Sequence, residues 1–217
     1  MINKLIKRTN TPEFYNDCDL TLKSYTFDAL NRICEVVITL NHNSYDSPEV
    51  NEIWKIIGSN AQKGHGFSTK ILLPYTKLQL LDNHPLLWFY NKDVLTCEIQ
   101  GIPNDLNKLV FDLVKILEKQ AGDWIMLNAI LGHFSNYMFK IPKIINIPAT
   151  LEESLQQAFI AQELSFKVID FNTDDYDYEQ DSDMKVLIFG NEDVCPNRLN
   201  GSQPYIIAKD FTAERIK

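Results

Sequence analysis

The residues best suited to chemistry lie in one acidic segment, NTDDYDYEQDSD, at positions 172 to 183. Six carboxylates and two tyrosines occur there without a single basic side chain. Such a density of negative charge attracts cations, either a metal ion or the basic surface of another protein. The candidate binding residues are Asp174, Asp175, Tyr176, Asp177, Tyr178, Glu179, Asp181 and Asp183.

Three interpretations of this acidic segment stay open. It can be a solvated connection whose charges keep a sheet edge from pairing with other chains. It can bind Ca²⁺, because carboxylates alternate from 175 to 183, although the turn glycine, the flanking helices and the terminal Glu of an EF-hand are missing. It can also be a protein-binding epitope, in which tyrosines supply rigid contact area beside the charges. The mixture of acid and tyrosine favours the epitope over a spacer.

The charge of the chain is local. The sequence has 21 basic and 29 acidic residues and a formal net charge of -8, of which the acidic segment supplies six charges. A surface for nucleic acid or for an anionic membrane needs clustered Lys and Arg, so this composition argues against both partners. A basic protein is the partner that the charge would attract.

Sequence motifs for catalysis or for cofactors are absent. Neither GxxxxGK[ST] nor GxGxxG occurs, and we interpret GHG at 64 to 66 as a flexible turn. There is no HExxH, CxxC or GxSxG motif, and the four histidines are isolated in the sequence. We therefore nominate no catalytic residue, cofactor or metal ligand. We expect the four cysteines to be buried, reduced thiols: Cys18, Cys34, Cys97 and Cys195.

Length and composition predict one domain. The chain has 217 residues, of which 45% are hydrophobic, enough for a single packed core over residues 1–217. The N-terminus has no apolar run of signal-peptide length, and no stretch approaches 18 apolar residues. We expect a cytoplasmic protein.

The first half of the chain predicts a hairpin and then a helix. The hairpin combines residues 19–27 and 33–41, which are rich in β-branched and aromatic residues. Residues 47–58 show the spacing of an amphipathic helix, with Ser47 as N-cap and Trp54 in the core. A strand is predicted to follow the GHG turn.

The second half predicts two further helices and several strands. Residues 85–101 indicate a hairpin that turns at 91–93, and residues 104–122 a helix that ends at Gly122. The apolar stretch 123–143 fits a helix or a strand equally well. A T-x-x-E capping box formed by Thr150 and Glu153 predicts a third helix, which continues to residue 162. The runs 163–171, 184–191 and 204–211 predict strands, so the acidic segment is an exposed loop between two of them.

These elements predict the α+β class, with a largely antiparallel sheet packed against about three amphipathic helices. In composition the chain resembles the immunity proteins of bacterial toxin systems, many of which mask a basic nuclease. That resemblance implies a non-enzymatic binding protein that neutralises a basic partner, with the acidic segment in the interface. Two alternatives are an enzyme whose site is assembled from distant residues, and a structural or adaptor subunit. For the adaptor, the apolar patch is expected at 88–90 or within 123–141.

Overall fold

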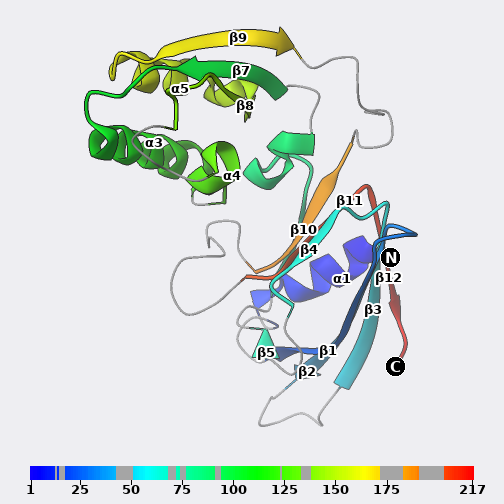
Figure 1. Cartoon of the computed structure of the whole chain (residues 1–217). Helices are drawn as coiled ribbons and strands as arrows, with labels where there is room; N and C mark the ends of the chain where they lie inside the picture. Colours follow the sequence, from blue (N-terminus) through cyan, green and yellow to red (C-terminus); the bar gives the residue numbers. More distant parts are fainter. Residues whose placement is uncertain are drawn as a thin grey trace. The chain divides into compact units, whose positions relative to one another are not determined.

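The computed structural model describes residues 1–12, 14, 18–42, 51–67, 72–73, 77–90, 94–122, 124–132, 138–171, 183–190 and 203–217. The chain divides into two units: unit 1 is Met1–Leu87 with Asp183–Lys217, and unit 2 is Trp88–Ser182 (Figure 1). Helices occur together with antiparallel sheets, which confirms the predicted α+β class. The prediction of one domain stays a prediction, and the units are described one at a time.

The described part of unit 1 contains helix α1 and two antiparallel sheets. The five-stranded sheet has the order β12-β3-β2-β1-β5, and the four-stranded sheet the order β4-β11-β10-β6. The elements are α1 (Ile2–Thr9), β1 (Cys18–Asp28), β2 (Ile33–His42), β3 (Asn51–Ser59), β4 (Lys63–His65), β5 (Leu72–Leu73), β6 (Leu78–Leu81), β10 (Lys185–Phe189), β11 (Tyr205–Ala208) and β12 (Asp210–Arg215). The β1–β2 hairpin is confirmed.

Two chain segments pass from one sheet of unit 1 to the other. The segment β3–β4 pairs with the segment β11–β12, with Ser59 opposite Asp210 in one sheet and Lys63 opposite Ile207 in the other. Between these pairs, the three residues 60–62 face only the two residues 208–209. The extra residue is a bulge, at which Asn60 takes a φ of 52°, and bulges bend strands at such corners. The inner faces of both sheets can therefore share one core.

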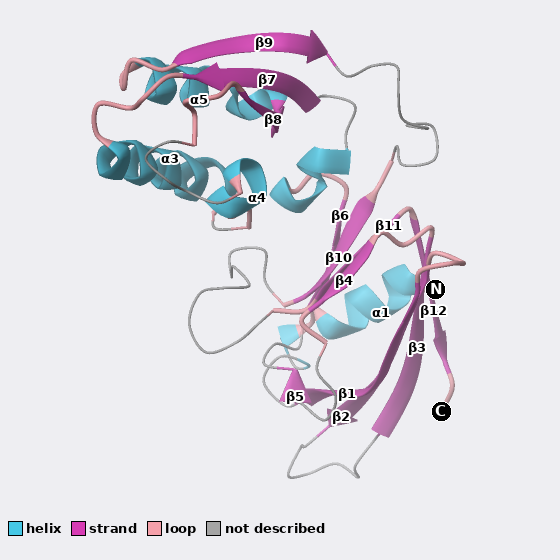
Figure 2. Cartoon of the chain, viewed as in Figure 1, coloured by secondary structure: helices cyan, strands magenta, loops and turns pink. Residues whose placement is uncertain are grey.

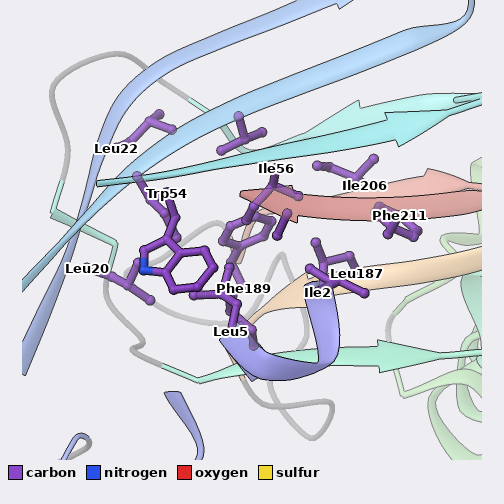
Figure 3. Packing of buried hydrophobic residues seen from close by; sticks show 14 of the residues in the cluster. Ile2, Leu5, Leu20, Leu22, Trp54, Ile56, Leu187, Phe189, Ile206 and Phe211 are labelled. Atoms are coloured by element: carbon purple, nitrogen blue, oxygen red, sulfur yellow. The ribbon is translucent and has the colours of Figure 1, made fainter. Parts of the chain in front are cut away.

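The core of unit 1 lies between these inner faces and α1 (Figure 3). Side chains alternate along each strand, so every second residue of β3 points inward, including Trp54 and Ile56. The helix contributes Ile2 and Leu5. Trp54 is 3% exposed, which confirms its predicted place in the core.

The predicted helix at 47–58 is wrong. The described part of this range, together with Ser59, is strand β3, and Ser47 lies outside the described residues. Ile53, Trp54 and Ile57 fit the helical spacing, but the same residues also fit a strand, with Trp54 on one face and the two isoleucines on the other. Pairing with β2 on one side and β12 on the other satisfies the backbone and decides for the strand.

Unit 2 is a three-stranded antiparallel sheet with the order β8-β7-β9 and its helices on one side (Figure 2). The chain enters it through the 3₁₀ helix η1 (Pro85–Tyr90). Its other elements are β7 (Val94–Gln100), α3 (Leu106–Ala121), α4 (Leu127–Leu131), β8 (Lys143–Pro148), η2 (Ala149–Leu151), α5 (Glu152–Ile160) and β9 (Ser165–Phe171). Leu95, Cys97 and Ile99 of the central strand point into the core, which the helices complete with Leu109, Leu113 and Phe159 among others.

Both helices predicted for this region exist, with different N-termini. Helix α3 begins after Asp105, whose carboxylate accepts a hydrogen bond from the Lys108 N–H at 3.0 Å, and ends at Gly122 with a φ of 55°. The capping box at Thr150 is wrong, because Thr150 lies in η2 and α5 begins after Leu151 without a side-chain cap.

Two other local predictions need correction. The hairpin at 85–101 is wrong, since residues 85–90 form η1 and only the second half, β7, is a strand. The GHG turn is wrong for Gly64 and His65, which belong to β4, whereas Gly66 lies beyond the strand with a φ of 78°. The undecided stretch 123–143 contains the short helix α4 and the first residue of β8. Helix α1 was not predicted, because its eight residues are too few for a strong periodic pattern.

Candidate functional site

The acidic segment connects the two units. It follows β9, the last strand of unit 2, and precedes β10, the first strand after the return to unit 1. Its flanking strands belong to different sheets, so the expected loop between two strands is the return connection from unit 2 to unit 1. Of the eight candidate residues only Asp183 is described, and it is exposed with a φ of 67°. Asp174, Asp175, Tyr176, Asp177, Tyr178, Glu179 and Asp181 lie outside the described residues.

The net charge of the protein belongs entirely to unit 2. Unit 1 has 14 basic and 14 acidic residues, hence a formal net charge of zero. Unit 2 has seven basic and 15 acidic residues, hence -8, and five of those acidic residues lie between 174 and 181. A field that attracts cations therefore originates in unit 2 and in its return connection.

A buried carboxylate forms the best-defined polar cluster of unit 1. Glu52 is 8% exposed and accepts a hydrogen bond from the Trp54 Nε1–H at 3.0 Å. Its carboxylate lies 3.5 Å from Arg8 Nη2 and 3.9 Å from Arg215 Nε. Because these residues come from α1, β3 and β12, Glu52 ties three elements together. Its partners neutralise it, and its role is structural.

The histidines whose side chains are described are separate from one another. His84 is buried, and its Nδ1 accepts a hydrogen bond from the Leu86 N–H at 3.2 Å. Burial lowers the pKa of His84 to about 4, so its imidazole is neutral at physiological pH. His65 lies 5.1 Å, between ring centroids, from Tyr205. Within the described ranges, no three His, Cys, Asp or Glu side chains are grouped as metal ligands would be.

Three of the four cysteines are buried thiols as predicted, and Cys195 lies outside the described residues. Burial raises the pKa of Cys34 to about 12 and that of Cys97 to about 11. A cysteine reacts as its thiolate, and these two thiols stay protonated at neutral pH. They belong to the cores of their units.

An apolar tip, which the sequence did not indicate, lies at the turn of the β1–β2 hairpin. Leu30 is 96% exposed, and Phe27 and Ile33 beside it are 38% and 40% exposed. The Asp28 carboxylate fixes the turn by accepting hydrogen bonds from the N–H groups of Leu30 and Asn31. An exposed leucine on a fixed turn is a surface that a partner can cover.

The apolar regions that the sequence nominated are divided between core and surface. Trp88 packs against the core of unit 2, whereas the neighbouring Phe89 is 37% exposed. Between 123 and 141, Trp124 is buried, and Met126 and Ile141 are exposed. The described residues contain no helix that is long and apolar enough to cross a membrane.

Comparisons of the chain with protein-family models, curated proteins and solved structures give no match. Function is therefore inferred from the residues and their arrangement. Two features stand out: the segregated charge of unit 2 and the apolar tip of unit 1.

Proposed function

We propose that this protein binds and neutralises a basic protein partner in the cytoplasm, in the manner of a toxin immunity protein. The contact residues are those of the acidic segment, from Asp174 to Asp183. The observation that carries the proposal is the division of charge, because unit 2 has the whole net charge of -8 while unit 1 has none. Packing of the fold does not require the net charge to lie in one unit, whereas a cationic partner is attracted by this distribution.

Charge complementarity gives this interaction its expected character. It accelerates encounter and excludes partners of the wrong charge, whereas close aromatic contacts supply much of the affinity. Tyr176 and Tyr178 stand among the carboxylates and provide such contacts. The proposed interaction needs no cofactor, and neither nucleic acid nor a membrane is the expected partner.

A capture experiment with two charge variants tests the proposal. The full-length protein is immobilised, a lysate of its native cell is applied, and retained proteins are identified across a salt series. The test variant carries Asp174→Asn, Asp175→Asn, Asp177→Asn and Glu179→Gln. We expect the wild type to retain a basic protein whose binding weakens with salt, and the variant to lose it.

The control variant removes four charges elsewhere. Glu118→Gln, Glu163→Gln, Asp210→Asn and Glu214→Gln all change exposed acidic residues outside the acidic segment. This variant has the same net charge as the test variant and should still bind the partner. Equal binding and equal salt dependence for the wild type and the test variant would contradict the proposal.

A second candidate function follows from the apolar tip. If the protein is an adaptor subunit, the contact is made by Leu30, which is exposed on a fixed turn, and by Phe27 and Ile33, which are partly exposed at the adjoining ends of β1 and β2. Leu30→Ser would then abolish capture of the partner, and the acidic variant would not. The same capture experiment separates the two functions, since each variant removes only one of the two surfaces.

A further inference from the structure

Unit 2 is inserted between two strands that are neighbours in unit 1. Strand β6 ends at Leu81 and β10 begins at Lys185, and the two strands pair in antiparallel fashion with Leu81 opposite Val186. A short turn ordinarily joins such neighbours. Here residues 82–184 lie between them. The pairing shows that the four-stranded sheet of unit 1 is continuous across the insertion.

The first and the last strand of unit 2 also pair with each other in antiparallel fashion. Its first strand, β7, and its last strand, β9, are neighbours in the three-stranded sheet, with Leu95 opposite Phe171. The chain therefore enters and leaves unit 2 at one end of a single strand pair. Among the described strands, none of the three sheets contains a strand from the other unit.

The two hydrophobic clusters are also separate. The cluster built around Leu20, Trp54 and Phe189 contains residues of unit 1 only, and the cluster built around Leu113 and Phe159 contains residues of unit 2 only. A unit with its own complete sheet and its own core has what cooperative folding requires.

We infer that unit 2 is an inserted module that folds and unfolds on its own, while β6 and β10 hold unit 1 together across the insertion. The inference concerns the two folds and does not depend on the proposed partner. A basic partner that fails to appear would remove the proposed function and leave this inference intact.

Amide hydrogen exchange of the full-length protein, read by mass spectrometry, tests the inference with a matched pair of variants. Ile56→Val removes one methylene near the centre of β3, and Ile99→Val removes one near the C-terminal end of β7. Both isoleucines are fully buried in sheets. We expect each substitution to lower the protection factors of the slowest amides in its own unit by roughly two- to tenfold and to leave the other unit unchanged.

The amides of β6 and β10 are decisive, because these strands flank the insertion. Under the inference, Ile99→Val leaves their protection unchanged and Ile56→Val lowers it. A second pair, Ile56→Ala and Ile99→Ala, removes more of each side chain and should lower the protection factors further. If an alanine variant fails to fold, the valine pair decides. A uniform fall of protection in both units after either substitution would overturn the inference, as would a loss of β6 and β10 protection after Ile99→Val.

Discussion

The two units differ in charge and in architecture, and the two differences coincide. Unit 1 has a formal net charge of zero and surrounds its core with strands from two sheets, whereas unit 2 has a net charge of -8 and one sheet with helices on one side. The core of unit 2 is apolar and makes no use of the excess charge. Because the hydrophobic core does not require the excess charge, we propose that its role is recognition.

The largest effects should come from removing a core aromatic ring in either unit. Phe189 of unit 1 and Phe159 of unit 2 are both fully buried and packed against other rings. We expect Phe189→Ala and Phe159→Ala each to lower the free energy of unfolding of its own unit by about 3–5 kcal/mol. Urea titrations followed by tryptophan fluorescence measure this, since Trp54 reports on unit 1 and the other two tryptophans on unit 2. If each variant lowered the urea midpoints of both unfolding transitions equally, the two units would not differ in their response.

An intermediate effect is expected from the buried carboxylate of unit 1. Glu52→Gln keeps the shape but removes the charge that faces Arg8 and Arg215, and we expect a loss of about 2 kcal/mol. The matched control is Glu35→Gln, which breaks the ion pair between Glu35 and Lys55 at 2.6 Å, whose side chains are 33% and 27% exposed. The control should cost less than about 1 kcal/mol and should matter less at high salt. Similar losses from both variants would show that burial does not set the strength of these pairs.

Acid should weaken unit 1 through His84. Burial depresses the pKa of His84 to about 4 in the folded protein, below its ordinary value of 6.5, so the unfolded chain binds more protons as the pH falls. The contribution of His84 to stability is therefore complete above pH 6.5 and is lost as the pH falls toward 4. At about pH 5.5 we expect a loss on the order of 1 kcal/mol.

His84→Asn tests this effect, because an amide oxygen can accept the hydrogen bond from the Leu86 N–H without titrating. The dependence of unit 1 stability on pH should then become flatter between pH 7 and 5.5. His65→Asn is the comparison, because partial burial also lowers the pKa of His65 but this residue is much more exposed than His84. It should flatten the pH dependence less than His84→Asn does. An unchanged pH dependence in His84→Asn would show that His84 does not control acid stability.

Sequence predicted the elements well where local signals were long and consistent. Helix α3 has sixteen residues of regular spacing and ends at a glycine, and both features depend only on neighbouring residues. Strand β3 was mistaken for a helix because its apolar residues fit two periods, and only its pairing with β2 and β12 decides between them. The continuous apolar run YIIA indicated β11, which is buried along its whole length.

The division into units could not be predicted from local signals. It depends on the pairing of β6 with β10, which are separated by the whole of unit 2, and no Pro-, Gly- or Ser-rich linker in the sequence marks the boundary. The charged segment was evident in the sequence, but its position between the units was not, because that position follows from which sheets contain β9 and β10. Strand pairing between residues distant in the sequence, rather than local secondary-structure propensity, determines both features.

The smallest expected changes in stability distinguish two helix starts in unit 2: one has a side-chain cap in the structure, and for the other only the sequence predicted a cap. The Asp105 carboxylate accepts the Lys108 N–H at the start of α3, so Asp105→Ala should cost about 1 kcal/mol. Thr150 has the sequence of a cap, but α5 begins beyond it without a side-chain cap, and Thr150→Ala should change stability by less than about 0.5 kcal/mol. Urea titration of unit 2 compares the two variants directly. Equal losses would mean that Thr150 stabilises the start of α5 in solution after all, and a loss confined to Asp105→Ala would show that the hydrogen bond, rather than the motif, determines the stability of the helix end.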